Sequence, residues 1–166
     1  MNSHYLMMTG LLVCLCVTVV PVSAAINAYV TNWYDNSVSV IDTATNTVNA
    51  TVPVGRYPLG VGVTPDGSKV YVGNHYDRTI SVIDGTNNTV ISVIPVELNP
   101  GHVAVTPDGS TAYITENPES NSPVNVLVIS SSKDAVVGTI PIPAGNESYF
   151  LAFPSKLQTQ YSKLSF

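Results

Sequence analysis

A 42-residue stretch of this sequence is followed directly by a second copy of itself. Residues 28–69 and 70–111 align without a gap, and 22 of the 42 aligned positions are identical. A third copy keeps Tyr113 in phase, carries about four extra residues, and resumes at Val126. A fixed period of this length is typical of solenoids, propellers and other arrays in which each copy covers the next.

Turn residues divide each copy into four short segments. Residues 59–63, 69–74, 79–84 and 89–95 are short and rich in Val and Ile, which predicts strands rather than helices. Between the first two lies Thr64-Pro65-Asp66-Gly67, where Pro suits the second turn position and Gly the left-handed residue that closes a hairpin. Four antiparallel strands in 42 residues make one propeller blade. We therefore predict an all-β fold, a β-propeller of about three four-stranded blades.

The first strand of each predicted blade is expected to lie innermost. It carries small residues, Gly60 and Gly62 in one copy and Gly101 and Ala104 in the next. Small side chains let strands approach closely where wedge-shaped blades converge on an axis.

Several segments closely resemble the YVTN-type β-propeller repeat. They are AYVTN at 28–32, VSVIDTATNTV at 38–48, VPVGRYPLGVGVTPDGSKVYVGN at 52–74 and IPVELNPGHVAVTPDGSTAYITEN at 94–117. The resemblance covers about residues 26–153. It implies a propeller of the kind frequent in archaeal surface-layer and other cell-surface proteins, and found in bacterial exported proteins. Typical relatives have seven or so blades.

This chain departs from that pattern in its number of blades. The repeats, residues 25–153, contain twelve predicted strands, from 26–32 to 149–153, and residues 154–166 form a non-repeat tail. Propellers commonly have four to eight blades. Three explanations stay open: a shortened piece of a longer propeller, a half-ring that forms a six-bladed homodimer, or an arc that sits against other surface proteins.

The first residues are predicted to direct export. Residues 6–22 form an apolar run without a charge, followed by the small residues of a signal-peptidase site before Ala25. We predict a signal peptide over residues 1–24, a cell-surface or extracellular location, and no membrane span after cleavage. An uncleaved anchor is the alternative, because no Lys or Arg precedes the run. Cys14 and Cys16 both lie in this segment, so the mature chain has no disulfide.

Charge excludes one class of partner. The chain has 6 Lys and Arg against 11 Asp and Glu, with a formal net charge of −5. The cations are scattered singly, so no basic patch is present to neutralise phosphates. We therefore expect no nucleic-acid binding.

The sequence predicts no catalytic, cofactor-binding or metal-binding residue. His75 and His102 are the only histidines after the leader and have no neighbour at ligand spacing. Asp42 and Asp84 end equivalent strands, so turn-capping hydrogen bonds explain them better than acid–base chemistry does. We predict a noncatalytic module, a structural or binding element without a cofactor. The alternative, implied by resemblance alone, is an inactive remnant or partial unit of a haem-d1, quinoprotein or lactonase-type enzyme propeller.

Aromatic residues in two equivalent loops are the candidate binding residues. Trp33 and Tyr34 follow the first YVTN-type strand, and His75 and Tyr76 follow the second. Loops on one rim of a blade array form the usual recognition surface of such scaffolds, and exposed Trp and Tyr favour contacts with proteins or sugars. The predicted partners are other cell-surface proteins or glycans. Packing between blades is the alternative for Tyr34 and Tyr76.

Three sequons are candidate N-glycosylation sites in an exported chain. They begin at Asn49, Asn87 and Asn146, in segments predicted to lie on the surface. Chance occurrence is the alternative, because Asn and Thr are common in this sequence.

Overall fold

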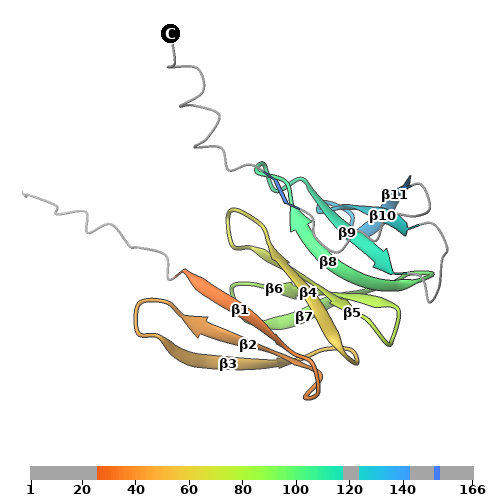
Figure 1. The fold of residues 1–166 in the computed structure, drawn as a ribbon. Coiled ribbons are helices and arrows are strands. Elements are labelled where there is room, and N and C mark those ends of the chain that lie inside the picture. The colour runs from red at the N-terminus through yellow and green to blue at the C-terminus, as the bar shows by residue number, and fades with distance from the viewer. Residues whose placement is uncertain (1–25, 118–123, 143–151, 154–166) are drawn as a thin grey trace, which may run out of the picture.

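Three antiparallel sheets lie side by side as successive blades (Figure 1). The structure is a computed structural model, and it describes residues 26–117, 124–142 and 152–153. Within these ranges all the regular secondary structure is β-strand. The described residues therefore include no helix that could cross a membrane. The predicted all-β class and the division into about three propeller blades are confirmed.

Each blade follows the chain in order. The first is β1 (Asn27–Asn32), β2 (Ser37–Asp42) and β3 (Thr47–Pro53); the second is β4 (Pro58–Val63), β5 (Lys69–Asn74), β6 (Thr79–Asp84) and β7 (Thr89–Pro95); the third is β8 (Asn99–Val105), β9 (Thr111–Asn117), β10 (Val124–Ser130) and β11 (Ala135–Ile142). The strands predicted at 69–74, 79–84 and 89–95 have the predicted bounds.

The repeated turns have the predicted backbone conformation. Gly67 and Gly109 have φ angles of 72° and 73°, a region that glycine occupies without a steric penalty. The Gly67 N–H donates to the Thr64 carbonyl at 2.8 Å, and Gly109 makes the equivalent bond in the next copy. The TPDG sequence therefore forms the same hairpin turn in both copies.

Apolar side chains fill the spaces between the blades. One cluster joins the first two blades, and its buried members are Val38, Val40, Val52, Val70, Val72 and Ile83. A second cluster joins the last two, and its buried members are Tyr71, Ile80, Val82, Ile94, Ala112, Ile114, Leu127 and Ile129. The middle blade is therefore covered on both faces. Full burial of a Val or Ile side chain contributes about 1.5–3 kcal/mol, so the two clusters hold the blades together.

The inner strands approach closely, as the small residues predict. A Cβ atom added to Gly60 in β4 would lie 2.3 Å from the Gly101 carbonyl oxygen in β8, which leaves no room for a side chain. On the other side of β4, the Thr31 hydroxyl in β1 donates to the Leu59 carbonyl at 3.0 Å. β4 thus lies between β1 and β8 (Figure 1).

The outer blades differ from the middle one at their free faces. Val30 in β1 is 47% exposed, whereas Val72, at the same position of the next copy, is fully buried. At the other end, the Phe153 ring lies 5.3 Å from that of Tyr113 in β9. Most of the predicted strand at 149–153 lies outside the described residues, as do the predicted signal peptide at 1–24 and the tail at 154–166.

Candidate functional site

Three loops at one end of the first two blades bring five aromatic side chains together. Trp33 and Tyr34 lie between β1 and β2, Tyr57 between β3 and β4, and His75 and Tyr76 between β5 and β6. We call these five residues the rim cluster. The four rim residues predicted from the sequence are therefore neighbours in space.

Tyr57 is the centre of the rim cluster. Its ring stacks on that of Trp33, with centroids 5.1 Å apart and planes 11° from parallel. Tyr34 and Tyr76 each meet it edge-on, at centroid distances of 6.5 and 5.5 Å. His75 adds a tilted contact with Trp33 at 5.8 Å. Stacked and edge-to-face pairs of this kind add about 0.5–1.5 kcal/mol beyond the burial of their area.

Backbone hydrogen bonds hold Tyr57 in place. Its φ of 53° lies in the left-handed region that residues other than glycine seldom occupy. The Tyr57 N–H donates to the Asn36 side-chain oxygen at 3.0 Å, and its carbonyl accepts from the His75 N–H at 3.0 Å. Residues held in such conformations cluster at functional sites. The central ring is thus fixed by the loops on both sides of it.

A charged pair lies beside the rings. The Arg56 Nε is 2.6 Å from Asp77 Oδ1, and the Arg56 N–H donates to Asp77 Oδ2 at 2.8 Å. These hydrogen bonds, the backbone N–H above all, lower the pKa of Asp77 and keep it ionised. The Arg56 guanidinium lies 4.5 Å from the centroid of the Tyr76 ring, in cation–π contact.

The rim cluster is open to solvent on one side. Tyr34 is 85% exposed and Tyr76 is 58% exposed, so neither is buried between blades. Trp33, Tyr57 and His75 are half-buried beneath them. The arrangement offers aromatic faces and edges next to one cation and one anion, which suits recognition of a partner surface.

The sequence indicated four rim residues and missed the two that connect them. Tyr57 and Arg56 lie outside the loops that follow the YVTN-type strands, so a comparison of those loops did not include them. A signal was present in the repeat itself: the next copy has Asn99 and Leu98 at these positions. Differences between copies outside the strands could therefore have found both.

Other predicted residues lie apart from the rim cluster. The Asn49 and Asn87 side chains are exposed, as an acceptor asparagine must be, and Asn146 lies outside the described residues. Asp42 and Asp84 each accept a backbone N–H two residues later at 2.7 Å, which confirms their capping role. His102 lies on inner strand β8, two residues after Pro100, whose carbonyl oxygen is 3.4 Å from the His75 Nδ1.

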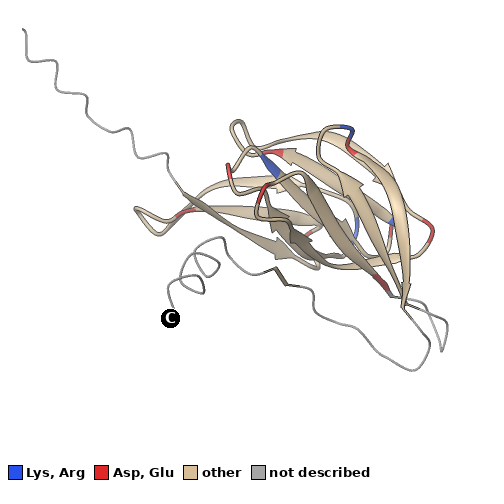
Figure 2. Ribbon diagram, turned by 90° about the horizontal axis from the view of Figure 1, so that it is seen from above, with Lys and Arg blue, Asp and Glu red and all other residues tan. Residues whose placement is uncertain are grey.

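The described residues contain no further cluster of metal-ligating side chains. Figure 2 shows the few charged residues mostly in loops and at strand ends. Across residues 26–117, 124–142 and 152–153, no three His, Cys, Asp or Glu side chains come together as a metal site would require.

Known propeller structures are similar to this chain over most of its described length. Hydrazine synthase of Kuenenia stuttgartiensis is 28% identical, with a TM-score of 0.66, over 74% of this chain and 33% of its own. A protein of unknown function from Desulfotomaculum acetoxidans DSM 771 is 24% identical, with a TM-score of 0.63, over 70% of this chain and 37% of its own. The dihydro-heme d1 dehydrogenase NirN, in complex with DHE, is 22% identical, with a TM-score of 0.58, over 70% of this chain and 24% of its own.

The family assignment comes from the whole sequence. The chain spans 24–37% of the length of those three structures, so each similarity covers only part of the other protein. Among curated proteins none matches. A family model described as YNCE-like beta-propeller matches residues 6–165. The chain belongs to the family of YNCE-like β-propellers.

Proposed function

We propose that this protein is an exported, noncatalytic β-propeller module that binds another cell-surface protein through the rim cluster. The observation that carries the proposal is the convergence of five aromatic rings, two of them largely exposed, on three loops of a rigid sheet array. Trp, Tyr and Arg are the residues enriched at the energetic centres of protein interfaces. Aromatic side chains lose little conformational entropy on binding because they have only two rotatable side-chain bonds.

A protein partner suits the site better than a glycan. The only Trp of the chain is half-buried against Tyr57, so its face is not free to stack on a sugar ring. The exposed groups are instead separate tyrosines and an Arg56–Asp77 pair whose Arg side chain is 60% exposed. Such a mixture resembles a protein interface, with apolar anchors beside polar groups.

Binding to the cell envelope tests the proposal. Purified chain is sedimented with envelope fragments, and the double variant Tyr34→Ala, Tyr76→Ala is compared with a control double variant, Val48→Ala, Ile91→Ala, at exposed strand positions. We expect the rim variant to lose about tenfold in affinity, which is about 1.4 kcal/mol, and the control to lose less than about twofold. Equal binding by the wild type and the rim variant would refute the proposal.

Treatment of the envelope distinguishes the class of partner. Protease should abolish binding by the wild type, whereas periodate oxidation of sugars should leave it intact. Loss of binding after periodate but not after protease would indicate that the rim cluster binds a glycan rather than a protein.

Export is the second part of the proposal. The apolar run at 6–22 and the small residues before Ala25 support it. Amino-terminal sequencing of the protein recovered from outside the cytoplasm should begin at Ala25. A chain that keeps its first residues and stays with membranes would favour the uncleaved anchor.

We also propose that two copies of the 166-residue chain complete a six-bladed ring. Val72 is fully buried against the first blade, but its counterpart Val30 is 47% exposed. Tyr71 is fully buried against the third blade, and its counterpart Tyr113 contacts Phe153, which returns to that free face. The free face of the third blade is therefore equivalent to the face with which the first blade covers the second. It could cover the first blade of another copy in the same way.

Solution mass tests the ring. Light scattering after size exclusion should give twice the chain mass over a range of concentrations, and Val30→Asp should give a monomer, whereas Ile91→Asp at an exposed position of β7 should not. A wild-type monomer or a heterogeneous aggregate would refute pairing and favour a piece of a longer propeller.

The enzyme-like alternative has less support. Two of the similar structures are named as enzymes, hydrazine synthase and a dehydrogenase. On the described inner strands, β4 and β8, His102 is the one ionisable side chain. General acid–base or nucleophilic catalysis needs several such groups placed within hydrogen-bond reach.

A further inference from the structure

One of the three sequons lies in a turn between two strands of the middle blade. Asn87-Asn88-Thr89 ends the turn that joins β6 to β7. The side chains of Asn87 and Thr89 are both exposed. An enzyme that modifies an asparagine must reach its side-chain nitrogen from outside, and a turn at the end of two strands allows this approach.

Hydrogen bonds within the turn fix the amide of Asn87. The Thr89 hydroxyl donates to Asn87 Oδ1 at 2.6 Å, and the Thr89 N–H donates to the same oxygen at 3.1 Å. The Asn87 Nδ2 donates to Asp84 Oδ2 at 3.4 Å. The amide oxygen is therefore held by two donors, and the amide nitrogen lies beside a carboxylate.

This arrangement favours reaction at the amide nitrogen. An amide nitrogen is a weak nucleophile, because its lone pair is delocalised onto the carbonyl oxygen. When the nitrogen loses a proton, negative charge develops on that oxygen, and hydrogen bonds to the charged form stabilise it. The two donors of Thr89 are placed at this oxygen, and the Asp84 carboxylate lies beside the proton that must leave.

The turn depends only on contacts between residues close in sequence. Two further hydrogen bonds run from the Thr86 N–H to Asp84 Oδ1 at 2.7 Å and from the Asn88 N–H to the Asp84 carbonyl at 2.9 Å. Asn88 has a φ of 57°, which asparagine adopts more readily than most residues do. Because all these bonds lie within residues 84–89, the turn can form before the blades pack.

The comparable positions of the chain do not combine an acceptor with this turn. The residues in phase with Asn87 are Thr45 in the first copy and Lys133 in the third. The other described sequon begins at Asn49 in β3, where Val48 and Ala50 on either side of it are paired with β2. That asparagine is presented by a strand rather than by a turn. Asn87 is therefore the favoured site.

We propose that Asn87 is N-glycosylated in the exported protein. This inference rests on export, the second part of the function proposed above. The Asn87 nitrogen forms a bond to the anomeric carbon of a sugar carried on a lipid-linked glycosyl phosphate. The bond from that carbon to the phosphate oxygen breaks, the lipid phosphate leaves with the electron pair, and one Nδ2 proton passes to a base. Nothing is oxidised or reduced.

A glycan on Asn87 would leave the rim cluster open. β6 runs from Thr79 to Asp84, so the loop with His75 and Tyr76 lies at one end of the strand and the Asn87 turn at the other. A strand of this length spans roughly 17–20 Å. The chain can therefore carry a glycan at one end of the middle blade and bind a partner at the other.

Mass spectrometry of the exported chain tests the site. The protein is recovered from outside the cytoplasm of the cells that make it, and its peptides are analysed for an added sugar mass. We expect the sugar on the peptide that contains Asn87. Asn87→Gln and Thr89→Val should lower its occupancy about tenfold or more, whereas Thr89→Ser, which keeps the hydroxyl, should retain most of it. Thr86→Val and Asn49→Gln are the matched controls and should leave it unchanged.

A second pair of variants tests the turn while the sequon stays intact. Asp84→Ala removes the carboxylate that caps the turn, and Asp42→Ala does the same in the equivalent turn of the first copy. We expect occupancy at Asn87 to fall about threefold in Asp84→Ala, the effect of about one hydrogen bond, and to stay unchanged in Asp42→Ala. Circular dichroism verifies that each variant is folded, and Thr89→Val serves if Asp84→Ala is not.

The failure of this inference and the failure of export give different results. Exported chain that begins at Ala25 and carries no sugar would overturn the site and leave export standing. Chain that stays in the cytoplasm would refute export and this inference together. Sugar that persists in Asn87→Gln would place the modification on another residue, and equal occupancy in Asp84→Ala would refute the part played by the turn.

Discussion

Replacing Gly60 by alanine tests whether the inner strands pack backbone against backbone. A Cβ atom on Gly60 would lie 2.3 Å from the Gly101 carbonyl oxygen, 2.7 Å from His102 Cα and 2.9 Å from Val103 N. All three are backbone atoms, so no side-chain rotation can relieve the overlap. β4 and β8 would have to move apart, and the cluster between the second and third blades would loosen with them.

The size of the effect follows from two opposing contributions. Overpacking a well-filled interior costs about 1–3 kcal/mol, and overlap with rigid backbone places Gly60 near the upper end. The smaller conformational freedom of alanine in the unfolded chain returns about 0.4–1 kcal/mol. We expect a net loss of about 2 kcal/mol, which in a domain of this size lowers Tm by about 4–8 °C.

Gly138→Ala is the matched control. The nearest atoms to a Cβ on Gly138 in β11 are those of Val128 at 3.8 Å, an ordinary contact. Thermal unfolding followed by circular dichroism should place this variant within about 2 °C of the wild type, with urea unfolding as a second measure. If Gly60→Ala melts together with Gly138→Ala, the inner strands do not converge as described.

Three further predictions concern the core, an ion pair and pH. Ile114→Ala, at a fully buried position between blades, should lose about 3 kcal/mol in urea unfolding, whereas Ile91→Ala, 50% exposed, should change stability by less than about 0.5 kcal/mol. Lys69→Met removes the partner of Asp134, 2.7 Å away in the next blade; both side chains are partly exposed, so we expect a loss of about 1 kcal/mol at low salt that shrinks in 1 M NaCl. The pKa of Asp66 is lowered to about 2 by hydrogen bonds from the threonine hydroxyl two residues before it and the serine two residues after it. Its stabilising contribution is therefore complete above about pH 4 and lost as the pH falls toward 2, and the Tm of Asp66→Asn should vary less than that of the wild type over this interval.

The repeat made the strands predictable because each copy has turn residues and apolar runs at the same positions. Turn residues such as Gly67 occur at fixed offsets from Val and Ile runs, and two copies in phase remove the ambiguity of a single one. The strand that begins at Val124 was predicted to begin at Val126, because the insertion before it interrupts the period. The turn and strand residues of one copy predict the four strands of a blade, and the number of copies predicts the number of blades.

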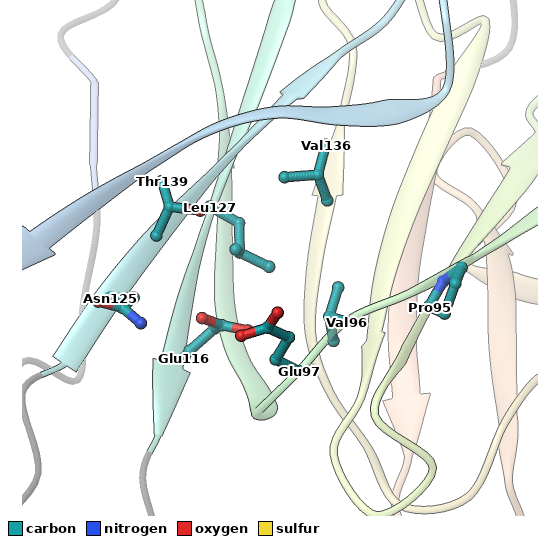
Figure 3. A pocket seen from close by; sticks show the side chains of 8 residues that line it. All are labelled: Pro95, Val96, Glu97, Glu116, Asn125, Leu127, Val136 and Thr139. Atoms are coloured by element: carbon teal, nitrogen blue, oxygen red, sulfur yellow. The ribbon is translucent and has the colours of Figure 1, made fainter.

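The rim cluster was only partly predictable because its side chains meet only where one blade packs on the next. Trp33 and Tyr57 are 24 positions apart in the sequence, and their stacking depends on how one blade docks on the next. Glu97 of the second copy and Glu116 of the third likewise line one cavity between blades (Figure 3). A sequence repeat describes one blade at a time, whereas the rim cluster lies at the junction between two blades.

Some differences between the copies lie at these junctions. Between the first two copies several buried strand positions change only among apolar residues, as from Val38 to Ile80. In the loops that connect the blades the changes alter the type of side chain: Tyr57 becomes Asn99, and Gly55 becomes Glu97. Because the buried clusters maintain the frame, the loops can differ without loss of the fold. An aromatic cluster at one junction and different residues at the next are therefore what an array of equivalent blades permits.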